Sequence, residues 1–206
     1  MKKQLIIIVP GPKYIKSKNK KLQKLILEVY SLFKEKGPLQ DNYFKLYSKR
    51  LKSENIETAC LNWGRNILIS TKWLAVQKLK RLIRRYQKKY SVSLVGISLG
   101  GELALEAAKK FDEKTIGKIF LIAPTIQNPY FSFKKIPIIN FFSSYDPIAK
   151  MGAKLYSPLI GSTKIKKGRN INIPKFTHFN FCLDSKIKHG KYKGKRISDL
   201  IKPYLK

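Results

Sequence analysis

Short, almost uninterrupted apolar segments alternate with longer amphipathic ones along most of this chain. The apolar segments are rich in Ile, Val, Leu and Phe and occupy residues 4–9, 56–63, 92–97, 118–123 and 136–142, with a further candidate at 170–175. A strand that is apolar on both faces is typical of a parallel sheet, because helices cover both sides of such a sheet. The pattern therefore predicts an α/β fold, a three-layer sandwich with a mostly parallel central sheet.

Helical periodicity marks the segments between these strands. Apolar residues recur at spacings of three and four over residues 18–36, 43–51, 72–90 and 102–111, and again from residue 196 to the C-terminus. In the 72–90 helix the spacing predicts that the following residues face inward: Trp73, Leu74, Val76, Leu79, Leu82 and Ile83. A chain of 206 residues suits one sizeable core better than two, so we expect a single domain over 1–206 with an extra helix at about 18–36.

Residues 96–101 read GISLGG, the pattern G-x-S-x-G followed by another glycine, and they lie between a predicted strand and a predicted helix. A serine in this position sits on a strained turn, and Gly96 and Gly100 make room because no Cβ collides with the adjoining elements. The turn lifts the serine hydroxyl clear of the sheet and aims the first helical NH groups at the bond it attacks. We interpret Ser98 as a nucleophile; the alternative is a buried serine in a tight turn.

A nucleophilic serine needs a base, and the chain has only two histidines. His189 lies in a Lys- and Gly-rich segment that we interpret as a surface loop, whereas His178 follows a predicted strand. Sites on parallel sheets form at the carboxyl ends of strands, so we favour His178. Among the five aspartates (Asp41, Asp112, Asp146, Asp184 and Asp199), the one that directly follows a strand is Asp146, in SSYDP. It is therefore the predicted partner of the imidazole.

The order Ser98, Asp146, His178, with GISLGG at the first of them, resembles the α/β-hydrolase superfamily. The N-terminal IIIVPG also resembles its small, compact, retinoblastoma-binding-protein-like serine hydrolases. The likeness runs from about residue 4 to residue 178. It implies that Ser98 is the nucleophile, that His178 is general base and then acid, that Asp146 holds the imidazole tautomer and that the Leu99 NH binds the oxyanion. The implied reaction is hydrolysis of a carboxylic ester, or less favourably an amide or thioester, through an acyl-enzyme, with no cofactor or metal.

The sequence departs from the superfamily pattern at the second oxyanion donor. That donor is the NH of the residue after the His-Gly or Pro-Gly pair, which here is Pro12, and proline has no NH. Gly11 or Lys13 would have to replace it. The loss of one such donor lowers the rate about 100- to 1000-fold, so a catalytically weak or inactive hydrolase-like domain is the alternative function. Such a domain would bind a polyanionic partner through its basic surface.

The chain is strongly basic, with 44 Lys and Arg against 12 Asp and Glu and a formal net charge of +32. Much of this excess is expected to be solvated surface, and no nucleic-acid motif accompanies it, so specific nucleic-acid binding is disfavoured. The basic amphipathic segment 18–36 is expected to be partly exposed near Ser98, at an anionic membrane surface; the alternative is that its apolar stripe packs on the sheet as an ordinary core helix. The two cysteines, Cys60 and Cys182, are expected to be reduced thiols. Because the sequence has no long apolar run or signal-like segment, we expect a cytoplasmic protein that is peripherally membrane-bound at most. Its expected partner is a small-molecule ester substrate.

Overall fold

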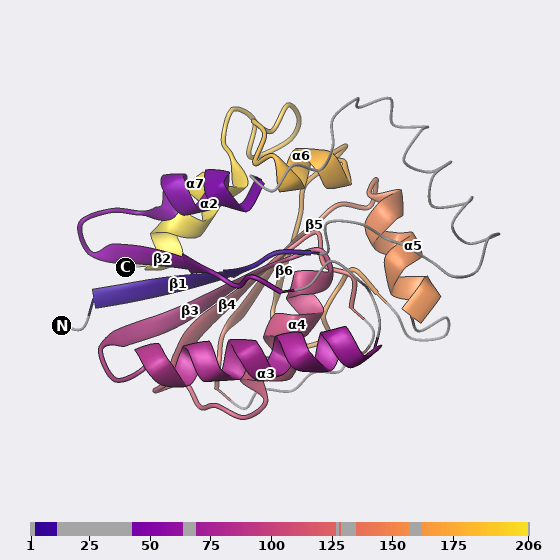
Figure 1. The fold of residues 1–206 in the computed structure, drawn as a ribbon. Coiled ribbons are helices and arrows are strands. Elements are labelled where there is room, and N and C mark those ends of the chain that lie inside the picture. Colours follow the sequence, from indigo (N-terminus) through magenta and orange to yellow (C-terminus); the bar gives the residue numbers. More distant parts are fainter. Residues whose placement is uncertain are drawn as a thin grey trace.

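A computed structural model describes residues 3–11, 43–63, 69–126, 128, 135–156 and 162–205. Its centre is a six-stranded sheet in the order β2-β1-β3-β4-β5-β6 (Figure 1). The strands are β1 (Lys3–Val9), β2 (Ile56–Cys60), β3 (Tyr90–Ile97), β4 (Ile116–Ile122), β5 (Ile138–Phe142) and β6 (Arg169–Asn172). All five pairings between these strands are parallel. The predicted fold class is therefore confirmed.

Helices cover both faces of the sheet (Figure 1). The described helices are α2 (Tyr43–Leu51), α3 (Ile69–Tyr86), α4 (Leu99–Ala108), α5 (Pro147–Tyr156), α6 (His178–Cys182), α7 (Ile197–Ile201) and the 3-10 helix η1 (Lys202–Leu205). The α3 and α4 helices pack on one face, and α2, α6 and α7 pack on the other. Residues 18–36, for which we predict an extra helix, lie outside the described residues.

The strand β1 shows how the sequence produces two cores. Leu5 and Ile7 belong to the cluster under α3 and α4, whereas Ile6 and Ile8 belong to the cluster under α2, α6 and α7. Successive side chains of a strand point to opposite faces, so only a solidly apolar strand can serve both layers. Burying each of these aliphatic side chains stabilises the fold by roughly 1.5–3 kcal/mol.

Two of the six residues of α3 that were predicted to face inward do not, whereas Leu79 and Ile83 are buried and Val76 and Leu82 pack against the core as predicted. Ala75, Leu79 and Ile83 are buried, but Trp73 is 61% exposed and Leu74 is 50% exposed. The buried residues recur every four positions, and the small Ala75 begins the stripe, so the helix packs closely there and turns Trp73 and Leu74 away from the sheet. The helix also ends at Tyr86 rather than residue 90, because Tyr90 already pairs with Lys3 in the sheet.

The C-terminal part agrees with the sequence in outline. The helix predicted from residue 196 begins at Ile197 and becomes a 3-10 turn at Lys202, just before Pro203. Such tightening is expected because proline cannot donate the next helical hydrogen bond. None of the described helices is long and apolar enough to cross a membrane.

Candidate active site

Ser98 lies at the junction between the end of β3 and the first residue of α4, as the GISLGG pattern predicts. Its backbone has φ 55° and ψ −128°, a conformation that non-glycine residues rarely adopt. Although Ser98 occupies the N-cap position of α4, its side chain makes no capping hydrogen bond. The Ser98 hydroxyl is therefore not bonded to the first turn of α4, and the surrounding turn maintains the strained backbone.

Two glycines make this turn sterically possible. A Cβ at Gly100 would lie 1.9 Å from the carbonyl oxygen of Val9, and a Cβ at Gly96 would lie 2.6 Å from the Cα of Gly101. Both distances are far inside van der Waals contact with backbone, which cannot move aside as a side chain can. The glycines in GISLGG are thus required for the approach of α4 to β1 and β3, as the sequence argument expects.

His178 and Asp146 are in direct contact. The Nδ1 atom of His178 lies 2.9 Å from Oδ2 of Asp146, and the two residues are 6% and 1% exposed. A carboxylate only accepts hydrogen bonds, so in the neutral imidazole this contact favours the proton on Nδ1 and leaves Nε2 with a free electron pair. This is the tautomer in which imidazole can remove a proton from a hydroxyl.

Local structure fixes both partners. Asp146 directly precedes α5, and its Oδ1 accepts a hydrogen bond from the Ala149 NH at 2.9 Å, while Pro147 takes the first helical position. His178 is the first residue of α6, whose N-cap Thr177 accepts a hydrogen bond from the Asn180 NH. Asp146 follows β5 and His178 follows β6, so both lie beyond carboxyl ends of parallel strands, as Ser98 does beyond β3.

The turn after β1 packs against Ser98. A Cβ placed on Gly11 would lie 3.0 Å from Ser98 Cβ and 3.4 Å from its Oγ, so the Gly11 backbone is a neighbour of the hydroxyl. Leu99, the other predicted oxyanion residue, is the first residue of α4, where a backbone NH has no acceptor within the helix. Pro12 and Lys13 lie outside the described residues.

Trp63 is a site neighbour that sequence reasoning missed. It is buried, and its indole NH donates a 2.8 Å hydrogen bond to the Pro10 carbonyl, next to Gly11. The bond joins residues 53 positions apart in the chain, so no spacing rule could have found it. The only signal in the sequence is that Trp63 ends the predicted strand at 56–63 and is followed by a glycine.

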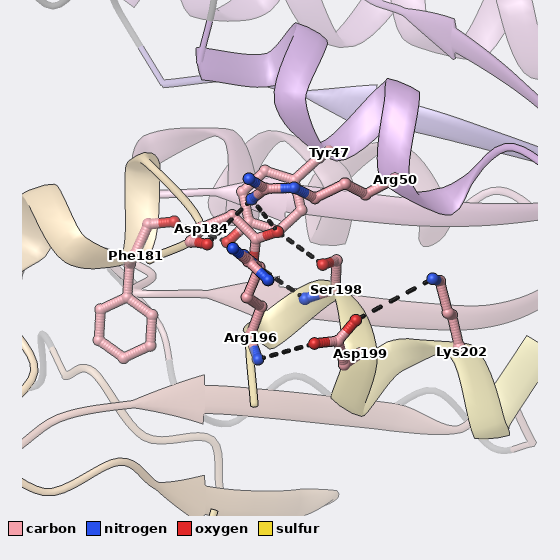
Figure 2. A network of polar contacts seen from close by, with 8 residues as sticks. All are labelled: Tyr47, Arg50, Phe181, Asp184, Arg196, Ser198, Asp199 and Lys202. Carbon is pink, nitrogen blue, oxygen red and sulfur yellow. Dashed lines mark hydrogen bonds and ion pairs between the residues drawn. The ribbon is translucent and has the colours of Figure 1, made fainter. Parts of the chain in front are cut away.

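Of the other four aspartates, the three that the structure describes do not contact the imidazole. Asp112 is exposed and bonds to Thr115, and Asp199 accepts from the backbone NH of Arg196, whereas Asp41 lies outside the described residues. Asp184 is fully buried, but it accepts hydrogen bonds from Arg50 Nη1 at 2.8 Å and Ser198 Oγ at 2.6 Å (Figure 2). His189 is exposed in the loop where it was predicted.

The two thiols are poor nucleophiles. Burial raises the pKa of Cys60 to about 12, and burial followed by the nearby Asp146 charge raises the pKa of Cys182 to about 12. Both cysteines are free. Within the described ranges, no group of three or more His, Cys, Asp and Glu side chains is arranged to hold a metal ion.

Comparison with known proteins supports the fold. No protein-family model matches the sequence, and no curated protein sequence matches it either. An alpha-beta serine hydrolase homologue from Coxiella burnetii is 14% identical, with a TM-score of 0.56 over 98% of this chain and 85% of that chain. Est1E from Butyrivibrio proteoclasticus is 11% identical, with a TM-score of 0.55 over 99% and 87%. A YdeN-like hydrolase from Pectobacterium atrosepticum is 16% identical, with a TM-score of 0.50 over 85% and 80%. The chain therefore has an α/β-hydrolase-like fold.

Proposed function

We propose that this protein is a serine hydrolase that cleaves a carboxylic ester of a small molecule through an acyl-enzyme. The observation that carries the proposal is the 2.9 Å contact between His178 Nδ1 and the buried Asp146, at the sheet edge where the strained Ser98 lies. The printed names of the structural neighbours are those of hydrolases, which agrees with this choice of reaction.

In the proposed mechanism, Nε2 of His178 removes the proton from Ser98 Oγ as the oxygen attacks the ester carbonyl. Asp146 keeps the imidazole in the required tautomer and stabilises the imidazolium that forms. The imidazolium then protonates the departing alcohol, which leaves an acyl group on Ser98. Water, deprotonated by His178, attacks this acyl group and releases the acid, and Ser98 regains its proton.

The tetrahedral oxyanion is proposed to rest on two backbone NH groups. The Leu99 NH supplies the first, because it opens α4 beside the nucleophile. The second comes from the turn after β1, either from Gly11, whose backbone lies against Ser98, or from Lys13. An ester fits this site better than an amide, because an ester carbonyl is attacked more easily and its alcohol departs more easily than an amine, so the reaction depends less on a complete set of oxyanion donors.

Mutant kinetics on soluble p-nitrophenyl esters test the proposal. Ser98→Ala and His178→Ala should each abolish hydrolysis above the buffer rate, and the double variant should be no worse than either, because both losses stop the same step. Ser144→Ala, which changes an exposed serine at the same sheet edge, is the matched control and should keep wild-type activity. Equal hydrolysis with and without Ser98 would contradict the proposal and favour an inactive hydrolase-like domain.

A further inference from the structure

The solvent face of α3 combines exposed apolar and basic side chains. Trp73 and Leu74, at 61% and 50% exposed, are among the most exposed large apolar residues in the described part of the chain. Opposite the buried stripe of Ala75, Leu79 and Ile83, helical geometry puts these two residues on the same face as the charged residues that follow them. The exposed basic residues of this face are Lys78, Arg81, Arg84 and Arg85, with Lys88 just beyond the helix.

The charge of this face is of a single sign. The α3 sequence contains six basic residues and no acidic one. The pKa of Lys72 is lowered, because burial outweighs the opposite effect of the nearby Glu102 and Glu106. Lys72 therefore belongs to the contact between α3 and α4 rather than to the solvent face. Three of the seven arginines in the chain are Arg81, Arg84 and Arg85, so the face is richer in Arg than the rest of this Lys-dominated protein. We call Trp73, Leu74, Lys78, Arg81, Arg84 and Arg85 the α3 face.

The apolar end of the α3 face lies toward the candidate active site. The β2 strand runs parallel to β3, so Cys60 and Ile97 end at the same edge of the sheet. The α3 helix begins after β2 at that edge and returns to the opposite edge, where β3 starts (Figure 1). Trp73 and Leu74 are in its first two turns, and Ser98 follows β3 at the same edge.

We propose that the α3 face docks on an anionic lipid bilayer and thereby presents the site to lipid-borne esters. The substrate part of this inference rests on the proposed function. Trp is favoured at the boundary between headgroups and acyl chains, and a neighbouring Leu can insert beside it. The basic residues along the same face are attracted to the negative surface of such a bilayer. A nucleic acid would match the charges but leaves the exposed Trp and Leu pair at the site edge unexplained.

Sedimentation with vesicles tests the docking. The full chain should sediment with equimolar phosphatidylglycerol and phosphatidylcholine vesicles at low salt, and much less with pure phosphatidylcholine. Trp73→Ala with Leu74→Ala should weaken the partition coefficient about tenfold, because the apolar area that enters the interface is lost. Arg81→Gln, Arg84→Gln and Arg85→Gln together should weaken it about 100-fold, since each cation near the surface contributes about a factor of 5.

Matched controls separate the α3 face from the diffuse charge of the protein. Leu183→Ala removes another exposed apolar residue, and Lys186→Gln, Lys188→Gln and Lys193→Gln remove three exposed charges from the basic loop. These controls should change binding less than threefold. Loop variants as damaging as the arginine variants, or apolar variants without effect, would overturn the proposal. Displacement by duplex DNA combined with an unaffected Trp73→Ala/Leu74→Ala variant would assign the face to nucleic acid instead.

Hydrolysis of a soluble ester by the wild type is measured in parallel. A wild type that hydrolyses the soluble ester but does not bind the anionic vesicles contradicts docking alone. One that binds through the α3 face but hydrolyses no ester upholds docking and contradicts the proposed function alone. Urea unfolding of each variant, with midpoints near that of the wild type, shows that lost binding does not come from lost folding.

Discussion

Two buried aspartates, Asp146 and Asp184, differ in what surrounds them. Both are at most 1% exposed, and each accepts at least one backbone NH. Asp184 also faces the permanent charge of Arg50 and the hydroxyl of Ser198, which tie α2 and α7 to the chain after α6. Asp146 instead faces the titratable ring of His178.

These partners suit the two aspartates to different roles, Asp184 to stability and Asp146 to the proposed proton transfer. A carboxylate that is paired with a guanidinium has a partner that keeps its positive charge, so the pair suits a structural joint. A carboxylate that is paired with imidazole orients a group able to gain and lose a proton near neutral pH. The partner, rather than the extent of burial, is therefore what supports the proposal that Asp146 and not Asp184 takes part in proton transfer.

The largest expected effect is on activity, at Asp146. Asp146→Asn keeps the side-chain shape and an oxygen for the Ala149 NH, but its amide NH cannot accept the proton on His178 Nδ1. The wrong tautomer is then favoured, and kcat for a soluble ester should fall about 10,000-fold. The free energy of unfolding should change by less than about 1 kcal/mol. A kcat within tenfold of wild type would contradict the proposed role of Asp146 in orienting His178.

Asp184→Ala should act on stability instead. It leaves the Arg50 guanidinium, which is about a third exposed, and the buried Ser198 hydroxyl without their carboxylate. The free energy of unfolding in urea should fall by about 3 kcal/mol, and kcat of the folded protein should stay near wild type. Asp199→Ala, which removes the cap on the Arg196 NH and an exposed 4.0 Å pair with Lys202 Nζ, is the control and should lose about 1 kcal/mol.

The organisation of the sheet and the elbow could be predicted from sequence because both depend on neighbours along the chain. Solid apolar strands such as Lys3–Val9 and the glycines around Ser98 carry their structural reason locally. The Arg50–Asp184 pair spans 134 positions, so it depends on how α2 meets the segment after α6 and leaves no local pattern. The prediction that Trp73 and Leu74 face inward was wrong for a similar reason: both are apolar residues of the helix, but packing against α4 and the sheet selects Ala75, Leu79 and Ile83.

A smaller effect on activity is expected at Trp63, which we treat as a positioning residue. Trp63→Phe keeps an aromatic ring but removes the NH that holds the Pro10 carbonyl, so the turn carrying Gly11 should loosen against Ser98. We expect kcat to fall roughly 10- to 100-fold, while KM changes little, because the turn acts on the oxyanion rather than on ground-state binding. A rise in KM with kcat unchanged would instead place Trp63 in substrate binding.

The smallest expected effect is on the pH dependence of stability, at Tyr47 beside Asp184. Burial, followed by the charge of Asp184, raises the pKa of Tyr47 well above its ordinary value of 10.0. The folded state therefore holds this proton more tightly than the unfolded state, so stability is fully present below about pH 10 and declines as pH rises further. Tyr47→Phe should lose about 1 kcal/mol at neutral pH, with the hydrogen bond to the Phe181 carbonyl, and should show a shallower alkaline decline. An unchanged alkaline slope in urea unfolding would contradict this role.

The most direct test of the proposed chemistry is peptide mapping after reaction with a fluorophosphonate, which phosphonylates an activated serine. We expect one adduct per chain, located on Ser98, formed rapidly by the wild type and by Asp184→Ala, and at least about 1000-fold more slowly by His178→Ala and Asp146→Asn. An adduct on another residue, or labelling of Ser98 at the same rate without His178 or Asp146, would contradict it.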